Sequence, residues 1–175
     1  MQITKEQFNL FFPTCPRLLK DTYFENLNIA LDESEINNNL RLAAFVAQIG
    51  HESGDLKWFE ELASGQEYEG RHDLGNTQAG DGKRFKGRGP LQLTGRYAYD
   101  KYSKELDIDM IKDPTLAAKP EWGFKIAILF WNDKGLNHLA DEGNFREITH
   151  RINGGYTHYD DRLTRYEIAK KELGC

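Results

Sequence analysis

Cysteine and proline are scarce in this sequence. Only two of its 175 residues are cysteines, Cys15 and Cys175, and only five are prolines. Two cysteines near the chain ends cannot build the disulfide framework on which small secreted domains depend. We therefore expect two free thiols, and a single bond between Cys15 and Cys175 stays open only if the two ends of the chain meet.

An excess of positive charge and a long apolar run are also lacking. The chain has 28 acidic and 23 basic residues and a net charge of −5, so no nucleic-acid partner is expected. The longest apolar run, residues 124–131, is interrupted by Lys125 and falls well short of the roughly 20 residues of a membrane helix. The first residues do not combine a basic segment with an apolar one. We expect synthesis in the cytoplasm without a Sec signal, and no integral membrane segment.

The composition that remains is that of a folded, mostly helical chain. Hydrophobic residues make up 39% and no linker or repeat divides the sequence, so we expect a single domain over residues 1–175 that includes the N-terminal part, residues 1–35. Thr4 followed by Gln7 resembles a capping box at the start of a first helix. Apolar spacing predicts further helices over residues 16–31, 34–52, 97–106, 121–132, 145–152 and 162–173.

Glycine is concentrated in the middle of the chain. Eight glycines lie between Gly65 and Gly95, at positions 65, 70, 75, 80, 82, 87, 89 and 95. Such a run excludes a regular helix and predicts long loops, with at most a small β-hairpin around Phe85–Leu93. Because a structureless segment of this length is usually functional, the expected architecture is two helical lobes with a loop-rich groove between them.

Glu52 stands at the end of an apolar helical turn, before Ser53 and Gly54. A zinc protease motif would need a second histidine at position 55, which is Asp55, and no two histidines are four residues apart. A solvated helix end is the ordinary interpretation of such a glutamate. Here, however, the apolar turn and the negative end of the helix dipole both favour the protonated carboxyl. A protonated carboxyl can serve as the general acid of glycoside hydrolysis.

That chemistry needs a second carboxyl group that stays ionised. The candidates are Glu60, Glu61, Glu67, Glu69 and Asp73. On one unbroken helix, Glu52 and Glu61 would point to opposite sides and lie about 13.5 Å apart along the axis. Gly54 can end the helix and Asp55 can begin a new turn, so the two glutamates can share one site.

Four ordered motifs connect these residues to a known family. They are GHESG at residues 50–54, YEGRHDLGNTQAGDGKRFKGRGPLQLTGRYAY at 68–99, GFKIAILFW at 123–131 and RINGGY at 151–156. Together they resemble glycoside hydrolase family 19, and within it the lysozyme-like endolysins of bacteriophages, over roughly residues 40–170. The resemblance implies a mostly α, lysozyme-like α+β fold.

The resemblance also implies roles for individual residues. Glu52 matches the general acid. Glu61 matches the general base of many bacterial and phage members, and Glu69 is the nearest match to the base of plant members, so it stays the alternative. Thr94 matches the residue that holds the attacking water. Further matches are Gln92, Tyr97 and Asn153 as sugar contacts and Arg165, with Arg162 as second choice, as the arginine that organises the acidic site. Trp58 is an additional candidate for stacking on a sugar or for core packing.

The implied activity is inverting hydrolysis of β-1,4 glycosidic bonds in the glycan strands of bacterial peptidoglycan, without a metal or cofactor. We expect a monomer that is made in the host cytoplasm and reaches the wall after the membrane has been permeabilised. Two alternatives stay open: a chitinase acting on N-acetylglucosamine polymers, and a glycan-binding protein without activity. Cleavage on the muramic acid side, the lysozyme activity, and cleavage on the glucosamine side are not distinguished by the sequence.

Overall fold

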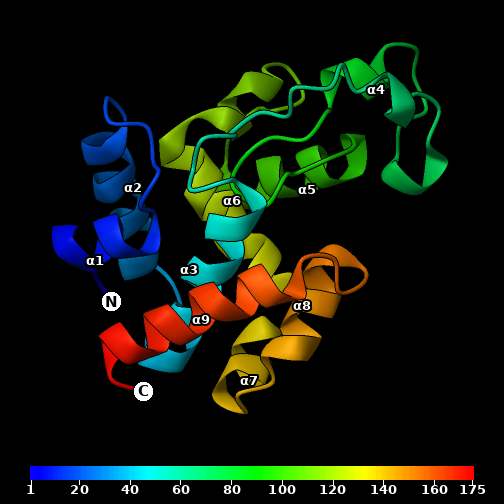
Figure 1. Cartoon of the computed structure of the whole chain (residues 1–175). Helices are drawn as coiled ribbons and strands as arrows, with labels where there is room; N and C mark the ends of the chain where they lie inside the picture. Colours follow the sequence, from blue (N-terminus) through cyan, green and yellow to red (C-terminus); the bar gives the residue numbers. More distant parts are fainter.

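Helices make up most of the chain in the computed structural model, which describes residues 1–175 (Figure 1). The α-helices are α1 (Lys5–Phe11), α2 (Lys20–Asp32), α3 (Asn39–Glu52), α4 (Asp81–Arg84), α5 (Arg96–Leu106), α6 (Pro120–Asp133), α7 (Leu136–Asp141), α8 (Phe145–Asn153) and α9 (Tyr159–Leu173). Three 3₁₀ turns complete the list: η1 (Gln66–Tyr68), η2 (His72–Leu74) and η3 (Pro114–Ala118). The mostly α fold expected from the sequence is confirmed.

The helix ends follow local sequence signals. Thr4 caps α1, and the side chain of Gln7 bonds back to the Thr4 backbone, which is the predicted capping box. The helix predicted over residues 34–52 begins later, at Asn39, because the side chain of Asn38 accepts the Arg41 N–H at 2.9 Å and caps it. The short helix α7 was not predicted.

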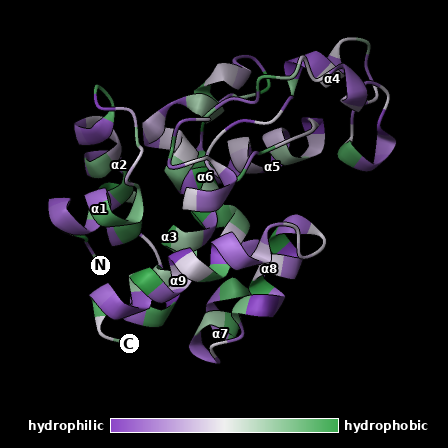
Figure 2. Ribbon diagram, in the orientation of Figure 1, coloured by the Kyte–Doolittle hydropathy of each residue, from purple (hydrophilic) through white to green (hydrophobic).

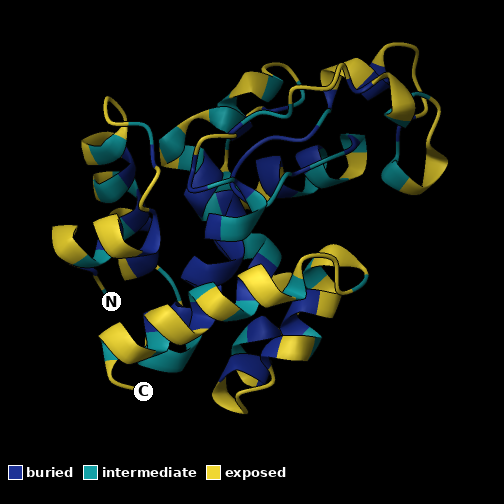
Figure 3. Cartoon of the chain, viewed as in Figure 1, coloured by how far each residue is buried: buried dark blue, intermediate teal, exposed yellow.

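Helix α3 runs through the centre of the molecule. Every residue from Leu42 to Gly50 is buried, and α3 packs against α1, α7, α8 and α9. Figure 3 shows α3 in the buried colour behind α9, whose outer face is exposed. Hydrophobic residues gather where the helices meet, as Figure 2 shows. The final residue of α3, Glu52, is therefore attached to the most enclosed helix of the fold.

Two hydrophobic clusters divide the interior, and α6 contributes to both. A cluster of 30 buried residues joins α1, α2, α3, α7, α8 and α9 and includes Phe124 and Trp131 of α6. A second cluster, of 7 buried residues, lies under α5 and η3 and includes Phe85 and Ile126. The two clusters correspond to the two expected lobes, and the glycine-rich segment contributes Phe85 and Leu93 to the smaller one.

The predicted hairpin around Phe85–Leu93 is reduced to single bridges. Arg88 pairs with Leu93 and also with Glu60 in antiparallel orientation, and no longer strand forms. Pro90 has no N–H to donate, and Gly89 and Gln92 both have positive φ (79° and 53°). These residues stop the ladder from extending beyond one pair.

The two cysteines form no disulfide. Cys15 is buried and Cys175 is exposed, and burial raises the pKa of the Cys15 thiol to about 11. The thiol of Cys15 is therefore protonated at neutral pH and packs as a small apolar group.

None of the helices has the length and apolar character needed to span a bilayer.

Candidate active site

Glu52 lies at the C-terminus of α3 in contact with a buried arginine. Its Oε1 is 2.6 Å from Nη2 of Arg162, whose side chain is only 2% exposed, whereas the Glu52 side chain keeps 22% of its surface exposed. The N–H groups of Arg162 do not point at this oxygen at the angle of a hydrogen bond. The buried Oε1 therefore has no hydrogen-bond donor from the protein. The carboxyl group is thus held by charge and reaches solvent on its other side.

Arg162 is fixed from two further directions. Its Nη1 donates to Oε1 of Gln48 at 2.6 Å, and its Nε donates to the backbone oxygen of Thr157 at 3.2 Å. Gln48 is fully buried and donates in turn to Oγ1 of Thr149 at 2.9 Å. Gln48 and Glu52 are four residues apart on α3, so they share the helix face to which Arg162 binds.

The structure places Arg162, the second choice from the sequence, against Glu52. Arg165 does not contact Glu52; it pairs with Asp55 at 2.6 Å and with Asp161 at 2.9 Å. Both arginines are on α9 three residues apart and therefore neighbours on its surface, and the sequence motif alone did not separate them. The sequence feature that could have distinguished them is Gln48, a polar residue one turn before Glu52 on the buried face of α3, which accepts a hydrogen bond from Arg162.

The chain reverses immediately after Glu52 through three residues with positive φ. Gly54, Asp55 and Leu56 have φ of 56°, 59° and 65°, a conformation that costs energy for residues with a Cβ. Distant contacts hold it: Asp55 accepts hydrogen bonds from the backbone N–H and the hydroxyl of Thr14 and from Arg165. The predicted helix stop at Gly54 is confirmed, and this reversal directs the chain toward Glu61.

Glu61 lies on a short paired segment opposite the glycine-rich loop. Its N–H donates to the Gly87 oxygen at 3.0 Å. Its Oε2 accepts the Gly87 N–H at 2.9 Å and the Tyr68 hydroxyl at 3.1 Å. The other carboxylate oxygen, Oε1, is buried without any hydrogen-bond donor. Burial, followed by the charge of Glu61, raises the pKa of Tyr68, so this phenol stays a donor.

The neighbouring Glu60 is fully engaged elsewhere. Its Oε1 lies 3.0 Å from Nζ of Lys86 and 3.4 Å from Nη2 of Arg88. Burial alone would raise the pKa of Glu60, but the hydrogen bond from Lys86 and the charge of Arg88 bring it below its usual value. Glu60 is thus a structural anion that ties its segment to residues 86–88.

Glu69, the alternative base, holds a loop. Its Oε1 accepts the Gly80 N–H at 2.7 Å, and its Oε2 accepts the Gly82 N–H at 2.8 Å. Both oxygens therefore serve the backbone that leads into α4, which leaves Glu69 with less freedom to bind a water than Glu61 has.

Three further predicted residues share one cavity of about 390 Å³. Gln92, Thr94 and Tyr97 line it together with residues of α5 and α6. The Thr94 hydroxyl donates to the backbone oxygen of Gln92 at 2.8 Å, which leaves its lone pairs free to accept from a water. The amide of Gln92 donates to the backbone oxygens of Gly89 and Trp58. Tyr97 is 69% exposed at the rim of this cavity.

Trp58 and Asn153 occupy exposed positions near the ends of α3 and α8. The Trp58 indole is 46% exposed and lies so close to Gly54 that a Cβ there would be 3.0 Å from it. Asn153 ends α8, and its Oδ1 accepts the Thr157 N–H at 3.2 Å. The backbone oxygen of Thr157 accepts from Arg162, so the loop after Asn153 adjoins the arginine that holds Glu52.

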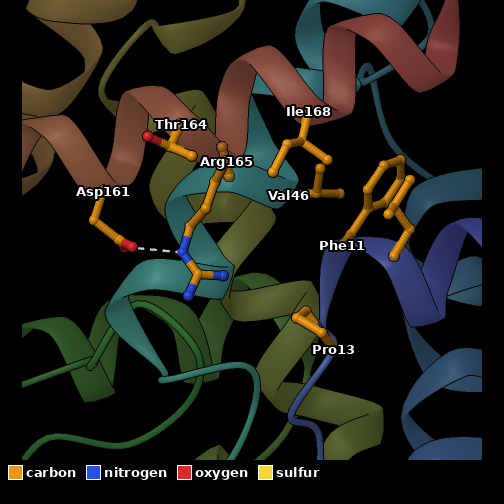
Figure 4. Close-up of a pocket in the computed structure, with 9 residues that line it drawn as sticks. Phe11, Pro13, Val46, Asp161, Thr164, Arg165 and Ile168 are labelled. Carbon is orange, nitrogen blue, oxygen red and sulfur yellow. Dashed lines mark hydrogen bonds and ion pairs between the residues drawn. The ribbon is translucent and has the colours of Figure 1, made fainter.

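A second cavity lies between α1, α3 and α9 and contains none of the predicted site residues except Arg165. Figure 4 shows Asp161 and Arg165 on one side of it and Phe11, Val46 and Ile168 on the other. Asp161 also contacts Nδ1 of His51, the residue before Glu52, at 2.6 Å. The cavity therefore lies beside the neighbour of Glu52, and Glu52 does not line it.

No group of three or more His, Cys, Asp or Glu side chains is arranged to hold a metal ion.

Comparison with known proteins identifies the family. The family model described as chitinase class I matches residues 22–141, which is more than half of the chain. The chain belongs to glycoside hydrolase family 19. It is therefore a chitinase-like glycoside hydrolase.

Relatives in this family come from bacteria and plants. A family 19 domain-containing protein of Haemophilus influenzae is 27% identical, with 95% of this chain and 94% of that protein covered. An Arabidopsis thaliana endochitinase is 38% identical over 76% of this chain, which spans 48% of the plant protein, about half of its length.

Solved structures of family 19 chitinases share the fold. Chitinase C of Streptomyces griseus matches with a TM-score of 0.78 at 22% identity, covering 98% of this chain and 92% of that one. A bacterial family 19 chitinase matches with a TM-score of 0.81 at 23% identity, covering 98% and 95%.

Proposed function

We propose that this protein hydrolyses the β-1,4 glycosidic bonds of bacterial peptidoglycan, as a phage endolysin does. One observation carries the catalytic part of this proposal. The Oε1 of Glu61 is buried without a hydrogen-bond donor, whereas both oxygens of Glu69 are bonded and the Oε1 of Glu52 is held by the charge of Arg162 at 2.6 Å. Because buried polar atoms are normally satisfied within a fold, the unbonded Oε1 supports Glu61 as the carboxylate that binds the attacking water.

In the proposed mechanism, Glu52 donates a proton to the leaving oxygen of the glycosidic bond. Glu61 takes a proton from a water held between its free Oε1 and the Thr94 hydroxyl, and this water attacks the anomeric carbon from the opposite face. The product then has inverted configuration. An inverting site needs its two carboxyl groups about 6.5–9.5 Å apart to admit that water. No metal or cofactor takes part in these steps.

The wall glycan is proposed as substrate because the sequence motifs resemble phage endolysins. Free thiols suit synthesis in a reducing compartment, so we propose that the protein is made in the host cytoplasm. It would then reach the wall after the membrane has been permeabilised. Chitin is the second candidate, because the Arabidopsis and Streptomyces relatives are named as chitinases.

The proposal is tested by identifying the new sugar ends. Purified peptidoglycan and soluble chitin oligomers are digested with the wild-type enzyme and with Glu52→Gln, and the reducing ends are reduced and identified by mass spectrometry. New muramic acid ends, absent with Glu52→Gln, are the expected result. Glucosamine ends would retain the mechanism and change the named bond. Turnover of chitin alone would establish a chitinase, and saturable wall binding without new ends would establish a binding protein.

Replacing Gly87 with alanine is expected to reduce kcat by about 10²-fold through misplacement of Glu61. A Cβ at this position would lie 2.5 Å from Oε2 of Glu61 and 2.6 Å from Oε1 of Gln92. Both atoms end flexible side chains, so the fold can adapt while the two site groups move. Steady-state kinetics and a melting curve are the measurements, and a variant with wild-type kcat would show that Glu61 need not occupy this position.

A further inference from the structure

Arg146 is an arginine without a protein partner for its N–H groups. Every other arginine except Arg17 donates a hydrogen bond or forms an ion pair within the protein. The guanidinium of Arg146 instead lies 4.1 Å from the ring centre of Tyr156 and 5.6 Å from that of Tyr159. An arginine stacked on aromatic rings keeps the edge of its planar group, with its N–H donors, free for a ligand.

The residues around Arg146 form an exposed polar stripe. Arg146, His150 and Asn153 recur at i, i+4 and i+7 on α8 and therefore lie on one helix face. Tyr156 folds back on this face, with its ring centre 5.4 Å from that of His150. Arg146, His150 and Tyr156, here called the Arg146 cluster, are all exposed. The stripe thus extends outward from Asn153, a predicted sugar contact.

The Arg146 cluster adjoins the loop beside Glu52. Thr157, the residue after Tyr156, accepts from Arg162 through its backbone oxygen, and Arg162 contacts Glu52. The next residue, His158, has its ring 5.6 Å from that of His51 on α3. A glycan bound at Glu52 would therefore place its substituents near this loop.

We propose that the Arg146 cluster binds a carboxylate of the peptide substituent carried by the wall glycan. A guanidinium presents paired N–H donors that match the two oxygens of a carboxylate. Such a local cation matters in a chain of net charge −5 that would otherwise repel an anionic substituent. The inference rests on the proposed function, because chitin carries no carboxylate and would leave the cluster unused.

The test compares two wall substrates. Wild type, Arg146→Gln and Arg146→Lys are assayed for kcat/KM on soluble peptidoglycan strands that carry their peptides and on the same strands stripped of peptide by an amidase. Arg146→Gln is expected to lose about tenfold on the peptide-bearing strands only. Arg146→Lys is expected to recover part of the loss, since lysine keeps the positive charge but lacks the paired N–H donors of the guanidinium group. Arg17→Gln, the other arginine without a partner, is the matched control and should lose nothing on either substrate.

The outcomes separate this inference from the proposed function. A loss of equal size on both substrates would assign Arg146 a role that does not depend on the peptide, and no loss on either would leave it without a role in binding; each result overturns the inference alone. A wild-type enzyme that cleaves chitin and neither wall substrate overturns the proposed function and, with it, this inference. Melting curves of the three variants establish that each remains folded.

Discussion

Replacing Glu61 with glutamine is expected to lower kcat by about 10²–10⁴-fold, the usual contribution of a positioned general base. The substitution keeps the shape of the side chain. In the wild type, the Gly87 N–H and the Tyr68 hydroxyl both donate to Oε2 of Glu61. The single amide oxygen of glutamine can accept both of these hydrogen bonds. The amide nitrogen then occupies the position of the free Oε1, where it cannot take a proton from water. Steady-state kinetics on wall glycan measure the loss, and KM should change little.

Glu69→Gln is the matched control for this prediction. It removes one acceptor from the Gly80–Gly82 loop and should change kcat only slightly, with a small fall in the melting midpoint. If Glu69→Gln abolished activity while Glu61→Gln retained it, Glu69 would be the base and the plant-type arrangement would apply. The pair of variants therefore decides between the two glutamates that the sequence left open.

Arg162→Met is expected to cost about 3 kcal/mol of the free energy of unfolding, the low end of the range for breaking a buried ion pair. Arg162 is 2% exposed, and its removal deprives Oε1 of Gln48 of its donor and leaves the partly buried Glu52 carboxylate without a cation. Denaturant unfolding of the wild type and the variant measures the difference. Arg151→Met, which breaks the exposed pair with Glu147 and the exposed hydrogen bond to the Lys134 backbone oxygen, should stay within about 1 kcal/mol of wild type.

A double-mutant cycle assigns the part of this loss that belongs to Glu52. Neutralising Glu52 in the Arg162→Met background should restore part of the stability, because the partly buried carboxylate that lacked a cation is gone. The expected coupling between Glu52→Gln and Arg162→Met is at least about 1 kcal/mol. Additive losses would mean that Arg162 is held for Gln48 and the Thr157 backbone, and that its contact with Glu52 contributes nothing to stability.

Local signals in the sequence were sufficient for several elements of the fold. The capping box at Thr4 and the helix stop after Glu52 each depend on residues that are close in the chain. The grouping of Gln92, Thr94 and Tyr97 in one cavity also follows from a short segment. In each case the determining contacts lie within a few residues, where helical periodicity and turn chemistry operate.

Contacts between distant segments were not predictable in this way. The positive φ of Asp55 and Leu56 contradicts their local preference. It depends on Thr14 and Arg165, which lie 41 and 110 residues away from Asp55. The choice of Arg162 over Arg165 is likewise made by Gln48, 114 residues from Arg162. Such pairings are created by the packing of α3 against α9 and have no counterpart in the pattern of either helix.

The two glutamates of the site are supported to different degrees. Glu52 ends a helix that is buried along most of its length, whereas Glu61 follows Glu60, whose segment is joined to Arg88 by an isolated bridge. Local opening in proteins follows such differences in buried contacts. The proposed acid is therefore anchored in the core, and the proposed base is anchored in the loops. We therefore expect changes of length or sequence in residues 62–86 to shift the position of Glu61 without disturbing Glu52.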